Sequence, residues 1–288
     1  MAPFYHARQA TAGWIRKGRQ FVRPPLISQA NLKRFLSEMD RHPRASLPLE
    51  PPRSVAVVVP CFKHAPYLPQ MFESIVAQTQ PPDEVIFIDD ASPDDSSEVI
   101  GTLFAAHPSP RGGRYSLLVN DRNLGQAASL NRAISTASSD LIMILNDDDY
   151  LMHDAVESMF ALFGQHRDVV LIGAHSIHFA GSEDLAAAPK LSTDHSASGL
   201  PLVVHRPDEV AGYRNYNDLN MTHSGSCFLK VAWEAVGGYQ VDKKRRVVPF
   251  SDRDFQLRVN AAWPVAVAYE TPFSFWRTDS SVDRGRDS

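Results

Sequence analysis

The chain has 288 residues, of which 43% are apolar and 22% are charged, and its formal net charge is −4. This length is enough to bury a hydrophobic core. The mildly acidic charge gives no electrostatic reason to expect a nucleic-acid partner. No apolar run is long enough to span a membrane, and residues 1–22 lack the apolar stretch of a signal peptide. Cys61 and Cys227 lie far apart in apolar surroundings, which favours buried thiols in a reducing compartment, so we expect a soluble, cytoplasmic protein.

Residues 1–53 differ in charge from the remainder of the chain, because they contain ten Lys or Arg residues and three acidic residues. A basic segment with interleaved aromatic residues can make peripheral contact with the inner face of an anionic membrane. Packing on the body of the protein or on a second subunit is the alternative that we favour, because prolines interrupt the segment. Apolar residues at helical spacing after Ser28 predict a helix over 28–41, and prolines between 43 and 52 predict a stiff linker.

From residue 54 onward, runs with strand character alternate with runs that have helical spacing. This alternation is typical of parallel strands joined by right-handed crossovers. It predicts an α/β fold with a mostly parallel, Rossmann-like sheet flanked by helices. Residues 181–199 show no periodicity and predict a loop. The predicted strands are 55–59, 84–88, 115–119, 140–145, 169–173, 223–230 and 265–268, and the predicted helices are 66–78, 94–106, 126–137, 154–163, 232–236 and 252–262.

The most informative stretch is the acidic cluster that follows the apolar run 140–145. Asn146, Asp147, Asp148 and Asp149 stand together at the end of this predicted strand. Ligands of open α/β sheets bind beyond the carboxyl ends of the strands. Crowded carboxylates repel one another unless a cation lies between them, and hard divalent cations take oxygen ligands. The residues alone favour a metal site and a solvated acidic loop about equally.

A second acidic pair, Asp89 and Asp90, ends the predicted strand 84–88. A carboxylate in this position can accept hydrogen bonds from a nucleobase or from a ribose hydroxyl. Helix capping is the alternative, and it explains Asp94 and Asp95, which precede the next predicted helix. It does not explain the pair on the strand.

Taken in order, these motifs resemble the family 2 glycosyltransferases over residues 54 to about 281. The resemblance implies a GT-A fold in a single domain, 54–288, with a nucleotide-sugar-binding half, 54–150, and an acceptor-binding half, 151–288. It also implies inversion at the anomeric carbon and a divalent metal cofactor, Mn²⁺ or Mg²⁺. The segments that carry the resemblance are Val57–Phe62, Ser74–Thr79, Ile88–Asp94, Asn123–Ala133, Leu145–Tyr150 (the DXD segment), Phe228–Tyr239 and Ser251–Arg258.

The resemblance assigns roles to individual residues. Asp252 matches the general base of the family, although Ser251 replaces the usual Glu before it and helix-terminal acidity is the alternative. Asp148 matches the metal-binding carboxylate. Asn146 stands where the family has the first acid of the DXD segment, and Asp279 stands where many relatives have a closing histidine. The expected metal ligands are Asp148, Asp149, Asn146 and Asp279; the donor-binding residues are Pro60, Phe62, Asp89, Asp90, Asn123, Gly125, Arg132, Asp147 and Arg277; the acceptor-binding residues are His223, Trp233 and Asp254.

The function that the resemblance implies is transfer of a sugar from a nucleotide-diphosphate sugar, with UDP-sugars favoured, to a hydroxyl of a glycan or lipid-linked acceptor. Such a reaction belongs to cell-surface polysaccharide biosynthesis. One alternative is a non-catalytic sugar-nucleotide-binding member of the family, which the replacements Asn146, Ser251 and Asp279 keep open. A nucleotidyltransferase is less expected, because residues 60–66 contain no glycine of a phosphate-binding loop.

Overall fold

The computed structural model describes part of the chain, and several sequence predictions lie outside that part. Residues 182–199 of the predicted loop, residues 41–49 of the proline-rich linker and most of residues 1–26 are among them. The described residues are 15–17, 20–22, 27–40, 50–107, 109, 113–181, 200–207 and 219–280.

Eight strands form one large mixed sheet, and every strand predicted from the sequence has a counterpart in it. These strands are β3 (Val55–Cys61), β4 (Glu84–Asp89), β5 (Arg114–Val119), β6 (Leu141–Ile144), β8 (Leu171–Ala174), β10 (Val203–His205), β11 (Cys227–Leu229) and β12 (Val265–Ala268).

The strand order is β10-β12-β8-β11-β6-β3-β4-β5. The neighbours β6, β3, β4 and β5 are parallel, which confirms the predicted α/β class. All residues of β3 and β6 are buried, as expected of strands covered on both faces. β11 runs antiparallel to both of its neighbours, β6 and β8. Because β3, β4 and β6 are parallel to one another, their carboxyl ends lie at one edge of the sheet.

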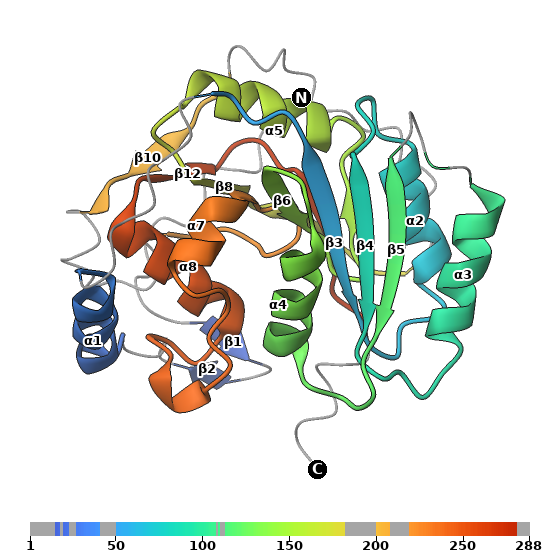
Figure 1. Ribbon diagram of the computed structural model, residues 1–288, viewed down its shortest axis with the longest axis horizontal. Coiled ribbons are helices and arrows are strands. Elements are labelled where there is room, and N and C mark those ends of the chain that lie inside the picture. Colours follow the sequence, from blue (N-terminus) through green and yellow to red (C-terminus); the bar gives the residue numbers. More distant parts are fainter. Residues whose placement is uncertain are drawn as a thin grey trace.

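Helices cover the large sheet. Figure 1 shows α4, α7 and α8 side by side on one face of it, and α4 contacts both β3 and β4 while α7 contacts β11. On the other side of the parallel strands, α2 packs against α3. The helices of the body are α2 (Leu68–Val76), α3 (Ser96–Ala106), α4 (Gln126–Thr136), α5 (Ala155–Gln165), α7 (Lys230–Ala235) and α8 (Ser251–Ala262), with a short 3-10 helix η5 (Lys243–Arg245) before α8.

A second, three-stranded sheet was not predicted from the sequence. It consists of β7 (Tyr150–Leu151), β13 (Ser274–Arg277) and β9 (Ser176–Phe179), in that order. These strands have two to four residues, too few to show a period, and their partners lie far away in the chain. β7 begins directly after the acidic cluster, so pairing of β7 with β13 brings the C-terminal segment to that cluster.

Part of the basic N-terminal extension contacts the body. Helix α1 (Gln29–Asp40) lies beside α8 (Figure 1) and buries Leu32, Phe35 and Met39. The amide of Ser28 donates to Val247 O at 2.8 Å, so the start of this segment is fixed to the loop before α8. Farther towards the N-terminus, β1 (Ile15–Lys17) and β2 (Gln20–Val22) form an antiparallel pair. None of the helices in the described residues is long and apolar enough to cross a membrane.

Candidate active site

The acidic cluster lies at the carboxyl edge of the parallel strands, beside the segment that leaves β3. Phe62 N donates to Asp147 Oδ2 at 2.9 Å, and His64 Nδ1 lies 2.8 Å from Asp147 Oδ1. Asp147 is therefore held by the segment that follows β3, although 83 residues separate it from His64. Burial lowers the pKa of His64, but the hydrogen bond to Asp147 and the carboxylate charges around it outweigh that effect, so its pKa lies above the ordinary value.

Asp148 completes a group of possible metal ligands. One ring nitrogen of His64 and one carboxylate oxygen each of Asp147 and Asp148 lie within 4.8 Å of one another. Burial raises the pKa of Asp148, and the adjacent negative charge of Asp147 raises it further, because like charges repel one another. A divalent cation would remove this repulsion, because carboxylate oxygens are ligands of both Mn²⁺ and Mg²⁺. The residues present therefore fit the implied cation.

Asp149, predicted as a further metal ligand, is used to join distant segments. Its side chain is fully buried and accepts hydrogen bonds from Ser224 Oγ, Asn146 Nδ2 and the amide of Arg277. Burial and the charge of Asp148 raise its pKa to about 7. Asn146 also accepts a hydrogen bond from Gln126 at 3.2 Å. Asp149 and Asn146 thus connect the acidic segment to β13 and to α4.

Asp90 organises the loop that enters α4. It accepts hydrogen bonds from the amides of Leu124 at 2.7 Å and Gly125 at 2.8 Å, and from Asn120 Nδ2 at 2.7 Å. Gly125 has φ +83° and ψ 154°, a conformation that is essentially restricted to glycine. Asp90 therefore positions this loop, and Asn123 lies on its exposed side.

The segments that follow β3 and β4 are connected to each other. Lys63 and Ala91 both have positive φ, 65° and 58°, which is uncommon for residues other than glycine and clusters at functional sites. Lys63 N donates to Ser92 Oγ at 3.1 Å, and Asp89 accepts hydrogen bonds from Ser92 N and Ser97 Oγ. Asp89 thus holds the loop after β4 in shape. Pro60 is buried within β3, and Phe62 at its end is partly exposed.

The two arginines predicted to bind the donor form hydrogen bonds within the protein. Arg132 donates to Val119 O at 2.7 Å and to Asn120 Oδ1 at 2.6 Å. Arg277 is 4% exposed, and its guanidinium donates to Asp148 O and to the Tyr150 hydroxyl. The same guanidinium lies 4.4 Å from the ring centroid of Tyr67 and 4.6 Å from that of Phe179. Arg277 therefore fixes the acidic segment through its backbone.

Asp279 lies beside Arg277 but outside the group of possible metal ligands. The amide of Gly181 donates to Asp279 Oδ2 at 2.8 Å. This hydrogen bond, together with the charge of Arg277, lowers the pKa of Asp279. The carboxylate is thus in its charged form, and its hydrogen bond joins residue 279 to residue 181.

The acceptor-side acids Asp252 and Asp254 have different environments. Asp252 lies in the first turn of α8, is partly exposed, and has no hydrogen-bonded partner for its carboxylate among the described residues. Asp254 is fully buried and forms an ion pair with Arg258 at 2.8 Å. It also accepts a hydrogen bond from Val247 N. Asp252 therefore has a free carboxylate, whereas Asp254 is part of the core.

The remaining predicted acceptor residues lie around the start of α8 and the end of α7. His223 is 8% exposed, and its Nε2 lies 2.9 Å from the Tyr239 hydroxyl. Burial lowers the pKa of His223, although the charge of Asp252 opposes this shift. Trp233 is partly exposed and donates from Nε1 to Asn131 Oδ1 at 3.3 Å.

Sequence reasoning did not select His64, which the structure brings into the acidic cluster. Its only sequence signal is its place three residues after a buried strand, and many residues share such a place.

Two surface clefts, one lined by Arg53 and Asp83 and the other by Ser138 and Lys230, lie at the opposite, amino edge of the sheet. They therefore have no part in this site.

Comparisons with known proteins identify the family. The model of glycosyl transferase family 2 matches residues 56–229. EpsE of Bacillus subtilis (strain 168) is 32% identical over 201 residues, which cover 66% of this chain and 70% of EpsE. Two other curated relatives are matched over only 38% and 47% of their own lengths.

Solved structures share the fold. Staphylococcus aureus TarS 1–349 in complex with UDP-GlcNAc has a TM-score of 0.58 at 11% identity, over 80% of this chain and 60% of that one. The mannosyltransferase PcManGT from Pyrobaculum calidifontis, in complex with GDP-Man and Mn²⁺, has a TM-score of 0.52 at 18% identity, over 83% and 64% of the two chains. The family model matches more than half of the chain, and the chain belongs to glycosyl transferase family 2.

Proposed function

We propose that this protein is a metal-assisted, inverting glycosyltransferase that moves a sugar from a nucleotide-diphosphate sugar to a hydroxyl of a glycan or lipid-linked acceptor. The observation that carries the proposal is the convergence of Asp147, Asp148 and His64 within 4.8 Å of one another at the carboxyl edge of the parallel strands. Ligands of α/β sheets bind at this edge, and the charged diphosphate of a donor needs a cation there.

The donor side of the site is the 54–150 half. TarS and PcManGT bind UDP-GlcNAc and GDP-Man respectively, which supports a nucleotide-sugar donor for this chain. We place the nucleotide beside Pro60 and Phe62 and against the loop that Asp90 holds. UDP is the nucleotide that we favour.

Asp148 would hold the cation, with Asp147 beside it. A bound cation would neutralise the negative charge that develops on the leaving diphosphate as the glycosidic bond breaks. The chain's own contribution is to fix this segment before the donor arrives: Phe62 N holds the carboxylate of Asp147, and Arg277 holds the backbone carbonyl of Asp148. Such preorganised electrostatics is usually the largest catalytic contribution.

Inversion requires a base on the face of the sugar opposite the leaving group. We assign this role to Asp252 in the 151–288 half, because its carboxylate is partly exposed and makes no hydrogen bond or ion pair with the described residues. It would accept the proton of the acceptor hydroxyl as the new bond to the anomeric carbon forms. Asp254 is unsuited to this role, because the Arg258 ion pair and the Val247 amide occupy its carboxylate.

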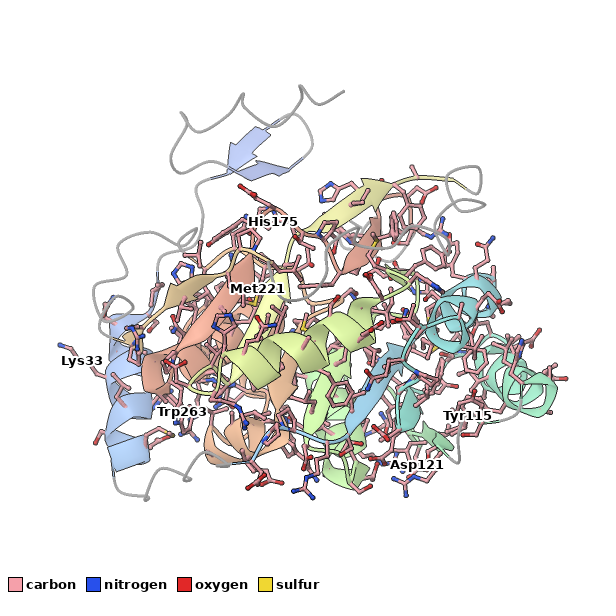
Figure 2. All side chains as sticks on the ribbon, turned by 90° about the horizontal axis from the view of Figure 1, so that it is seen from above. Lys33, Tyr115, Asp121, His175, Met221 and Trp263 are labelled. Carbon is pink, nitrogen blue, oxygen red and sulfur yellow. The ribbon has the colours of Figure 1, made fainter. Side chains whose placement is uncertain are left out.

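A lipid-linked acceptor would require contact with a membrane surface. Basic side chains of α1 and of η5 are exposed next to each other, since Arg245 pairs with Glu38 of α1. Figure 2 shows Lys33 of α1 pointing outward at one end of the molecule. Lys243 and Lys244 are exposed in the loop that leads to α8 and Asp252. We therefore include a peripheral contact with anionic lipid in the proposal.

Calorimetric titration with UDP, GDP, CDP and dTDP, each with and without Mn²⁺, tests the donor side. We expect one nucleotide to bind in a metal-dependent manner and Asp148→Ala to abolish the effect of the metal. Nucleotide binding that is equally strong with and without Mn²⁺ would contradict the role of the cation. Absence of binding for all four nucleotides would contradict the donor assignment.

A further inference from the structure

His64 has the features of a metal ligand that the family resemblance does not assign. It follows β3, is 5% exposed, and holds Asp147 through Nδ1 at 2.8 Å. Its other ring nitrogen, Nε2, is buried and has no hydrogen-bond partner among the described residues. An unpaired polar atom in a protein interior costs free energy, so a bound ion would supply the partner that the described residues do not give this nitrogen.

The contacts of His64 match a known arrangement around metal ions. A metal-bound histidine usually gives its second ring nitrogen to a carboxylate, which fixes the tautomer and the orientation of the ring. Asp147 is in that position, because its Oδ1 contacts Nδ1 while its Oδ2 is held by the amide of Phe62. The ring of Tyr67, at a centroid distance of 5.5 Å, packs edge-on against the imidazole and limits its rotation. His64 is thus oriented before any ion binds.

We propose that His64 is a nitrogen ligand of the cation that Asp148 binds, with Asp147 orienting the imidazole. This inference rests on the cation of the proposed function. It gives the cluster of His64, Asp147 and Asp148 a mixed nitrogen and oxygen character instead of an all-carboxylate one. Imidazole suits transition metals better than Mg²⁺, which prefers oxygen ligands, so the site should prefer Mn²⁺ over Mg²⁺.

Pulsed electron paramagnetic resonance of Mn²⁺ bound to the full chain tests this ligand directly. We would label the protein with ¹⁵N, keep UDP unlabelled, and record Mn²⁺ with and without UDP. The expected result is a ¹⁵N coupling of a directly bonded imidazole in the wild type. Because the label is in the protein alone, the coupling cannot come from the uracil base, and the wild-type measurement does not depend on whether a variant folds.

His64→Gln and His64→Asn should remove the coupling and lower Mn²⁺ affinity about tenfold or more, with a smaller loss for Mg²⁺. His166→Gln is the matched control, because His166 precedes β8 at the opposite edge of the sheet, and it should retain the coupling. Thermal unfolding would establish that each variant is folded.

Three results would overturn the proposal, and they show whether the proposed function fails with it. If Mn²⁺ binds and no ¹⁵N coupling appears, or if His64→Gln keeps it, then His64 only positions Asp147 and the cation assignment stands without it. If Mn²⁺ does not bind with or without UDP, GDP, CDP or dTDP, both the ligand and the metal-assisted function are refuted.

Discussion

Substitution of Asp254 should lower the stability of the protein, whereas substitution of Asp252 should lower its activity, although only one residue of α8 lies between the two acids. Asp254 is fully buried, and its partner Arg258 is 3% exposed. Arg258 also donates to Val236 O at 2.8 Å and to Gly238 O at 2.7 Å, so it cannot move to solvent without losing these bonds. Asp254→Ala would leave a buried guanidinium without its counter-charge and Val247 N without its acceptor.

The expected loss of stability follows from this geometry. Removal of one partner from a buried ion pair costs about 3–5 kcal/mol. For a chain of this size, each kcal/mol shifts the melting temperature by about 2–4 °C, so Asp254→Ala should lower Tm by roughly 6–20 °C. Asp252→Asn removes no hydrogen bond made by the described residues and should change stability by less than about 0.5 kcal/mol.

Urea unfolding and a transfer assay would be run on both variants with the donor that the titrations identify. Asp252→Asn should bind nucleotide normally and lose about 10²–10⁴-fold in kcat, because the base that accepts the acceptor proton is absent. If Asp254→Ala is as stable as the wild type, the buried ion pair does not stabilise α8 as argued. If Asp252→Asn retains turnover, Asp252 is not the base.

The stability of the metal-free protein should fall as pH rises from about 4 to 7. The pKa of Asp149 is raised to about 7 in the folded state, so the folded protein binds this proton more tightly than the unfolded chain does. Asp149→Asn should remove that part of the pH dependence, and an unchanged profile of urea midpoints would argue against it. Gly125→Ala should lower the free energy of unfolding by about 1–3 kcal/mol, because Gly125 has a positive φ. Gly101→Ala within α3 should raise the free energy of unfolding slightly, as Gly to Ala changes in helices do. Equal urea midpoints for the two variants would refute the role given to Gly125. Charge reversal of Lys243 and Lys244 should weaken sedimentation with anionic vesicles at least about fivefold and leave neutral vesicles unaffected, and unchanged sedimentation would remove this surface from the proposal.

Local patterns in the sequence were sufficient to predict the strands of the parallel half and the place of the acidic cluster. The β-branched run of β3 and the apolar run of β6 directly indicate that these strands are buried, because each residue of a central strand contacts apolar neighbours on both faces. Acids that follow such a run must lie at a sheet edge. The α/β class and the family resemblance followed from these segments in order.

The roles within the cluster depend on contacts between distant residues, which local patterns do not contain. His64 reaches Asp147 across 83 positions, and the Arg277 amide reaches Asp149 across 128. Asp148 and Asp149 are adjacent in sequence, but pairing of β7 with β13 brings Arg277 to Asp149, and pairing of β11 with β6 brings Ser224 there. Asp148 lies near His64 instead. Asp254 and Arg258 are four residues apart on α8, a spacing that local sequence does contain. Only the packing of α8, however, buries this ion pair and leaves Asp252 partly exposed. The sequence alone thus determined which chemical groups reach this edge of the sheet. The tertiary structure decided which of these groups remain available to a ligand, because the other groups form hydrogen bonds with buried neighbours.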